Sequence, residues 1–147
     1  NANVKQVMVE TLILLFDEVN AKGIRISEQI RKKLEWLQPF ADLENFEGEG
    51  DIWEASTTAK LVELFKEFTK ELRSMGYPAL IIHYNNLDKI HDEEILLDFL
   101  QDFREFMQNP DVIFIFIGDN LLYQVISGMS RLSQIFQHTP FYVRLVQ

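Results

Sequence analysis

Three short apolar runs, separated by helix-like segments, constrain the fold of this chain most strongly. They cover residues 79–84, 112–117 and 141–146. The first two are almost continuously apolar, without polar alternation, which is typical of strands buried on both faces. Because such strands alternate here with helices of about a dozen residues or more, the pattern predicts an α/β fold with a mainly parallel, three-layer sheet between flanking helices.

Apolar residues at helical spacing predict five helices between and before these runs. Glycine and proline mark most of their ends, and serine or aspartate stands where two of them begin. The predicted helices run from Val4 to before Gly23, from a cap at Ser27 to Pro39, over 57–75, from near Asp92 to Asn109-Pro110, and over 121–136.

The length of 147 residues predicts a single domain, 1–147. We divide it into a helical N-terminal part, 3–50, and an α/β part, 51–147. The acidic stretch 41–51 contains two glycines and has no periodicity, so it is interpreted as an exposed loop. Asn1-Ala2 is typical of residues left by cloning, and we therefore expect the natural chain to extend upstream.

Composition excludes several kinds of site. The chain has no cysteine, which rules out disulfides and thiolate zinc sites, and its three histidines lack metal-site spacing, so no metal site is predicted. A net charge of −9 argues against a nucleic-acid-binding face, so nucleic acid would be contacted only through domains outside this chain. No apolar run is long enough to span a membrane, and a cytoplasmic location is expected.

Polar residues follow the first two apolar runs directly. One end carries Asn85-Asn86-Leu87-Asp88 and the other Gly118-Asp119-Asn120. In open parallel sheets, ligands bind beyond the carboxyl ends of the strands, so these residues are candidates for a binding site. The alternative is that asparagine, aspartate and glycine are here because turns use them.

The order of these elements resembles the central part of AAA+ and STAND-type P-loop ATPases, particularly the initiator-like and NACHT/KAP-like groups. In those families, an apolar run followed by acidic residues is the Walker B strand, the next strand ends at the sensor position, and an arginine of the following helix can be the arginine finger. The resemblance covers about residues 51 to 147 and implies a partial P-loop NTPase-like fold that uses ATP and Mg²⁺.

The resemblance assigns roles to individual residues. Asn85 falls at the position of the magnesium-binding aspartate and Asn86 at that of the water-activating acid, while Asp88 matches a later aspartate of the motif. Asp119 or Asn120 would be the sensor and Arg131 the finger. Two departures matter, because an amide is a neutral ligand for Mg²⁺ and an asparagine cannot act as a general base at neutral pH.

The sequence contains no Gly-x-x-x-x-Gly-Lys-Ser/Thr, the loop that cradles phosphates in this fold. We expect that loop upstream of residue 1, and we expect this chain alone to be inactive as an ATPase. In full length, the protein would act as a nucleotide-dependent switch or motor. The alternative is a non-catalytic interaction or scaffold domain with a degenerate ATPase-like sheet. Protein partners or self-association through an unpaired strand edge are expected in either case.

Three further side chains have structural interpretations. His83 lies within an apolar run and is interpreted as a hydrogen-bonded interior histidine. Trp36 and Trp53 flank the acidic stretch and are interpreted as packing residues, since no basic neighbours are expected to make them a platform for base stacking.

Overall fold

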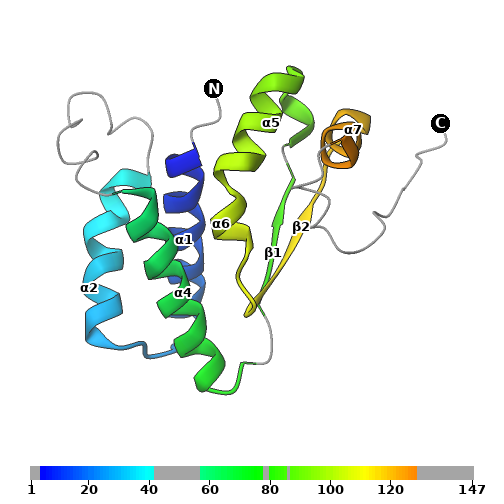
Figure 1. Ribbon diagram of the computed structural model, residues 1–147. Helices are drawn as coiled ribbons and strands as arrows, with labels where there is room; N and C mark the ends of the chain where they lie inside the picture. Colours follow the sequence, from blue (N-terminus) through cyan, green and yellow to red (C-terminus); the bar gives the residue numbers. More distant parts are fainter. Residues whose placement is uncertain (1–3, 42–56, 78–79, 86, 129–147) are drawn as a thin grey trace.

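Figure 1 shows the computed structural model of the protein, which describes residues 4–41, 57–77, 80–85 and 87–128. Helices α1, α2 and α4 stand together on one side, and the strand pair with α5, α6 and α7 on the other. The elements are α1 (Val4–Ala21), α2 (Glu28–Leu37), η1 (Gln38–Ala41), α4 (Thr58–Ser74), β1 (Leu80–Tyr84), η3 (Leu87–Lys89), α5 (Glu93–Asp102), α6 (Arg104–Met107), β2 (Val112–Phe116) and α7 (Asn120–Gly128).

Helix α1 ends as its sequence predicts. Gly23 adopts a left-handed conformation with φ 69°, which glycine accepts without steric cost. The Ile24 amide then donates to the Val19 carbonyl at 3.0 Å and closes the helix end. Met8, Leu12 and Phe16 are buried along one stripe of α1 and face the rest of the core.

Helix α2 begins where predicted but is capped differently. Ser27 occupies the N-cap position, yet its side chain makes no capping hydrogen bond among the described residues. Instead, its backbone amide donates to Oε2 of Glu71 on α4 at 2.8 Å. The expectation of a Ser27 side-chain cap is therefore wrong, because a carboxylate from a helix distant in sequence ties the start of α2 to α4.

Helix α4 joins the two sides of the molecule. Thr57 caps it, accepting a hydrogen bond from the Lys60 amide at 3.2 Å. Its buried residues Phe65 and Phe68 lie in the core, and the helix packs against both α1 and α2. α4 belongs by sequence to the α/β part, 51–147, yet it forms a three-helix cluster with the N-terminal helices.

The predicted parallel pairing of the first two apolar runs is confirmed. β1 and β2 pair in parallel with Leu80 opposite Val112 and Tyr84 opposite Phe116. The connection between them is helical, as expected, and Asp92 caps α5 by accepting from the amides of Glu94 and Ile95 at 2.9 and 3.2 Å. The single helix predicted here is instead two, α5 and α6, which meet at Phe103.

Aromatic rings attach the helices to one face of the sheet. Phe65 of α4 stacks on Phe106 of α6 at 4.0 Å between ring centroids, and both lie near Phe114 of β2. Tyr84 of β1 meets Phe103 edge-on at 5.5 Å. We call this side the helix-covered face; its residues are Leu80, Ile82, Tyr84, Val112, Phe114 and Phe116.

The opposite side of the sheet is exposed. We call it the open face; its residues are Ile81, His83, Ile113, Ile115 and Ile117. Ile81 is 61% exposed and Ile113 53%. The prediction that both strands are buried on both faces is thus wrong for this structure, and so is the interior position of His83. The α/β class is compatible with the strand pair and its helices, whereas the three-layer arrangement stays a prediction.

Some expectations fall on other parts of the chain. The acidic loop 41–51 lies outside the described residues apart from Ala41, as do the end of the predicted fifth helix beyond Gly128 and the strand at 141–146. Among the helices that the structure describes, none combines the length and the apolar character needed to cross a membrane.

Candidate functional site

The two polar strand ends lie at the same edge of the sheet. The Ile117 amide donates to the Tyr84 carbonyl at 2.9 Å, which carries the parallel pairing one residue beyond β2. Asn85 therefore leaves the sheet beside Ile117 and Gly118, and η3, which contains Asp88, packs against α7. This edge, formed by the chain after β1 and after β2, is called the strand-end rim below.

At the rim, Asn85 is bound to a histidine. Its Oδ1 lies 2.7 Å from Nδ1 of His83, and both side chains are exposed. An amide oxygen is an acceptor, so the imidazole Nδ1 donates to it. The amide oxygen that the resemblance assigns to Mg²⁺ is thus already engaged, and it is a weak ligand for that ion.

Asp119 has a structural task at the rim. Its Oδ1 accepts a hydrogen bond from the Leu121 amide at 3.0 Å, which satisfies an amide of the first turn of α7. Gly118 precedes it and leaves no room for a side chain, since a Cβ there would lie 2.7 Å from Cδ2 and 3.0 Å from Cβ of Leu122. The Gly118-Asp119 pair therefore sets how closely α7 approaches the end of β2.

The hydroxyl of Tyr84 ties the rim to the N-terminal helices. It lies 2.7 Å from Oγ1 of Thr11 on α1, and the threonine also donates to the Val7 carbonyl at 2.7 Å. Burial raises the pKa of Tyr84 above its ordinary value of 10.0, although the hydrogen bond between Tyr84 and Thr11 acts in the opposite direction. The phenol is a neutral structural group at physiological pH.

The structure brings together part of the predicted site. Asn85 and Asp119 lie at the rim with described side chains, Asp88 is in η3, and Asn120 is the first residue of α7. Asn86 and Arg131 lie outside the described residues. Within the part of the chain that the structure describes, no three histidine or acidic side chains form a group able to hold a metal ion.

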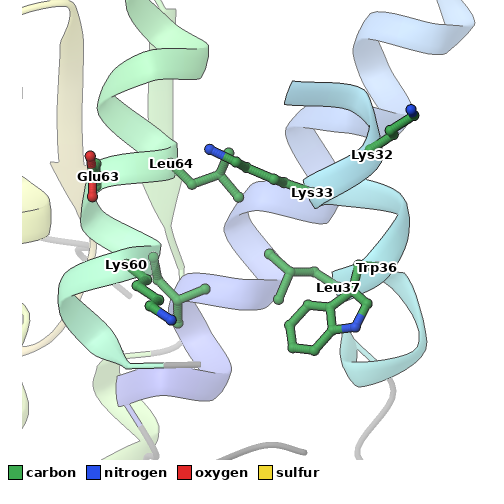
Figure 2. Close-up of a pocket in the computed structure, with 8 residues that line it drawn as sticks. Lys32, Lys33, Trp36, Leu37, Lys60, Glu63 and Leu64 are labelled. Carbon is green, nitrogen blue, oxygen red and sulfur yellow. The ribbon is translucent and has the colours of Figure 1, made fainter. Parts of the chain in front are cut away.

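A groove between α2 and α4 was not predicted from the sequence. It has a volume of about 510 Å³ (Figure 2), and Lys32 and Glu63 stand at its borders. We call it the lysine groove; the residues that line it are Lys32, Lys33, Trp36, Leu37, Lys60, Leu61, Glu63 and Leu64. The expectation that Trp36 lacks basic neighbours is wrong, because the fold brings Lys60 to the same groove from a helix distant in sequence.

The lysine groove left a weak signal in the sequence. Lys33 and Leu37 are four residues apart, as are Lys60 and Leu64, so each helix presents a lysine beside a leucine on one face. Nothing in the sequence indicates that these two faces meet.

Comparison of the chain with protein-family models, with curated proteins and with solved structures finds no match.

Proposed function

We propose that this chain forms the strand-end part of an AAA+/STAND-like ATP-binding protein, which acts in full length as a nucleotide-dependent switch or motor. The observation that supports the proposal is the parallel pairing of β1 with β2, which sets the polar ends of both strands on one rim. Ligands of open parallel sheets bind at such rims. The rim contains Asn85, Asp88, Asp119 and Asn120. For Asn86 and Arg131, only the resemblance supports the proposed roles of water-activating residue and arginine finger.

The rim's chemistry favours a sensing role over catalysis. Asn85 is a neutral amide bound to His83, and Asp119 holds the start of α7. A nucleotide phosphate near Asp119 would repel that carboxylate and compete with it for the Leu121 amide, and so shift α7. ATP and Mg²⁺ would bind only once a phosphate-binding loop completes the site, because a carboxylate and amides at a strand end do not cradle phosphates.

The test compares this chain with the full-length protein that contains it. Isothermal titration with Mg-ATP should give no binding tighter than about 10 μM for this chain and clear binding for the longer protein. In the longer protein, Asp119→Asn should lower ATP hydrolysis at least about tenfold. Asp98→Asn on the exposed side of α5 is the matched control and should leave hydrolysis unchanged. Tight binding by this chain alone, or full-length protein that neither binds nor hydrolyses ATP, contradicts the proposal.

A second candidate function is a non-catalytic interaction or scaffold domain. The open face favours it, since exposed isoleucines on two adjacent strands resemble a surface that another protein covers. Under this hypothesis, the full-length protein would bind its partner equally well with and without Mg-ATP. Asp119→Asn would not change the affinity of the protein for that partner. A pull-down with the full-length protein in both nucleotide conditions separates the two functions.

A further inference from the structure

The lysine groove combines an apolar floor with positive charge on both walls. We propose that it binds an acidic amphipathic helix of a partner protein, with apolar anchors of that helix on the floor and its carboxylates on the lysines. The site is separate from the strand-end rim, and the inference does not depend on ATP binding.

The floor of the groove consists of leucines that pack into the core. Leu37, Leu61 and Leu64 are nearly fully buried, at 2%, 1% and 6% exposure. Trp36 is 48% exposed, and its ring is held beside Phe40 at 5.3 Å between centroids. A half-exposed tryptophan whose ring already packs against another ring offers a large apolar surface and loses little side-chain entropy when a partner binds. Tryptophans of this kind often contribute most of the binding energy of an interface.

The charges of the groove select the occupant. Lys33 and Lys60 point into it from opposite helices, whereas the carboxylate of Glu63 is turned to the far side of α4 (Figure 2). Lys33 pairs with Glu67 at 3.4 Å in a bridge open to solvent. Among the residues that the structure describes, Lys32 and Lys60 have no carboxylate within salt-bridge distance. A partner's carboxylates would therefore meet Lys32 and Lys60 without a competing carboxylate, and would compete with Glu67 for Lys33.

An acidic helix fits these features better than nucleic acid. The chain as a whole carries a net charge of −9, which opposes the dense charge of a phosphate backbone. A peptide has fewer charges and supplies apolar side chains for the leucine floor. The volume of about 510 Å³ lies within the range of about 300–1,000 Å³ found for binding clefts. A groove between two helices suits apolar anchors at i, i+3 or i+4, and i+7 of a third helix.

The test uses fluorescence anisotropy with a fluorescein-labelled peptide that carries leucines at those spacings and aspartate and glutamate elsewhere. The whole 147-residue chain should bind it with a Kd of about 1–100 μM. Lys60→Glu and Trp36→Ala should each weaken binding about tenfold or more. Lys70→Glu, on the same helix but outside the groove, should change Kd less than about twofold. Both lysines are exposed, so their variants should melt like the parent chain.

Several outcomes would overturn the proposal. Equal binding of a peptide with alanine in place of leucine would show that charge alone acts, and tighter binding of a single-stranded oligonucleotide would show that phosphate is preferred. Peptide binding that emerges only when the acids of 42–51 are changed to amides would assign the groove to the chain's own acidic segment. Concentration-dependent association that Lys60→Glu abolishes would assign it to a second copy.

Discussion

The two faces of the β1–β2 sheet are both mainly apolar, but their surroundings differ. On the helix-covered face, Phe114 packs against Phe65 of α4 and Phe106 of α6, and Tyr84 packs against Phe103, where α5 and α6 meet. The open face carries isoleucines exposed by 44% to 61%. The phenylalanines and the tyrosine of the two strands thus lie on the side that helices cover, whereas β-branched residues occur on both sides. Burial on a sheet depends on which elements reach each face, and apolar character alone does not reveal it.

The largest effect is expected for a charge on the helix-covered face. Phe114→Asp removes a ring near Phe65, Phe106 and Tyr84, and deletion of a core phenylalanine costs about 3–5 kcal/mol. An unpaired carboxylate adds to that cost. Since domains are stable by only about 5–15 kcal/mol, this variant should lose its cooperative thermal transition in circular dichroism.

The matched control places the same charge on the open face. Ile115 is 44% exposed, so Ile115→Asp should cost less than about 1 kcal/mol. Strands buried on both faces, as the sequence predicts, would not tolerate aspartate at 81 or 115, and the exposure of these residues reverses that expectation. If Phe114→Asp and Ile115→Asp unfold the protein equally, the two faces do not differ in solution and the comparison fails.

An intermediate effect is expected where β2 is held against α4. Asn109 is buried, its Nδ2 donates to Oγ1 of Thr69 at 3.0 Å, and its Oδ1 accepts from the Asp111 amide at 2.9 Å. Asn109→Ala removes both hydrogen bonds and takes its partner from the Asp111 amide, although the Thr69 hydroxyl still donates to the Phe65 carbonyl. The variant should lower the free energy of unfolding by about 1–3 kcal/mol in urea titration. The exposed Asn20→Ala is the control, and an equal effect there would mean that the Asn109 contacts do not position β2.

The smallest effect is expected for the hydroxyl at the end of β1. Tyr84→Phe removes the 2.7 Å hydrogen bond to Thr11 and should cost about 0.5–1.5 kcal/mol near neutral pH. Because burial raises the pKa of Tyr84 in the folded state, its contribution is full below pH 10.0 and is lost as pH rises above that value.

The Tyr84→Phe variant should therefore lose less stability than the parent chain between pH 10.0 and about pH 11. Urea titrations at a series of pH values measure this difference, with Tyr77→Phe at an exposed position as the control. Parallel pH profiles for parent and Tyr84→Phe would show that the hydroxyl is not buried against α1.

The helices and the pairing of the strands could be predicted because their signals are local. The left-handed Gly23, the caps at Thr57 and Asp92, and the continuous apolar runs all act within a few residues. The break at Phe103 escaped prediction, since the apolar stripe continues from α5 into α6 and only the packing of Phe103 between Tyr84 and Phe106 separates them.

The candidate site could be predicted in position but not in chemistry. Strand ends follow from the apolar runs, so Asn85 and Asp119 were expected at one rim. Their hydrogen-bond partners depend on side-chain geometry. In the structure, Asn85 is hydrogen-bonded to His83, and Asp119 accepts a hydrogen bond from the Leu121 amide. The lysine groove could not be predicted, because Lys33 and Lys60 lie on different helices whose meeting is a tertiary event.

By itself, the sequence determined most of the described helices and the two strands through its spacing of apolar residues, the parallel pairing through a helical connection between apolar strands, and the absence of cysteine chemistry. Tertiary structure alone decided which face of the sheet is covered, that Glu71 caps α2, and that lysines of two helices share a groove with Trp36. The physical reason is range. Periodicity and capping act over a few residues, whereas burial and charge pairing depend on which distant segments pack together.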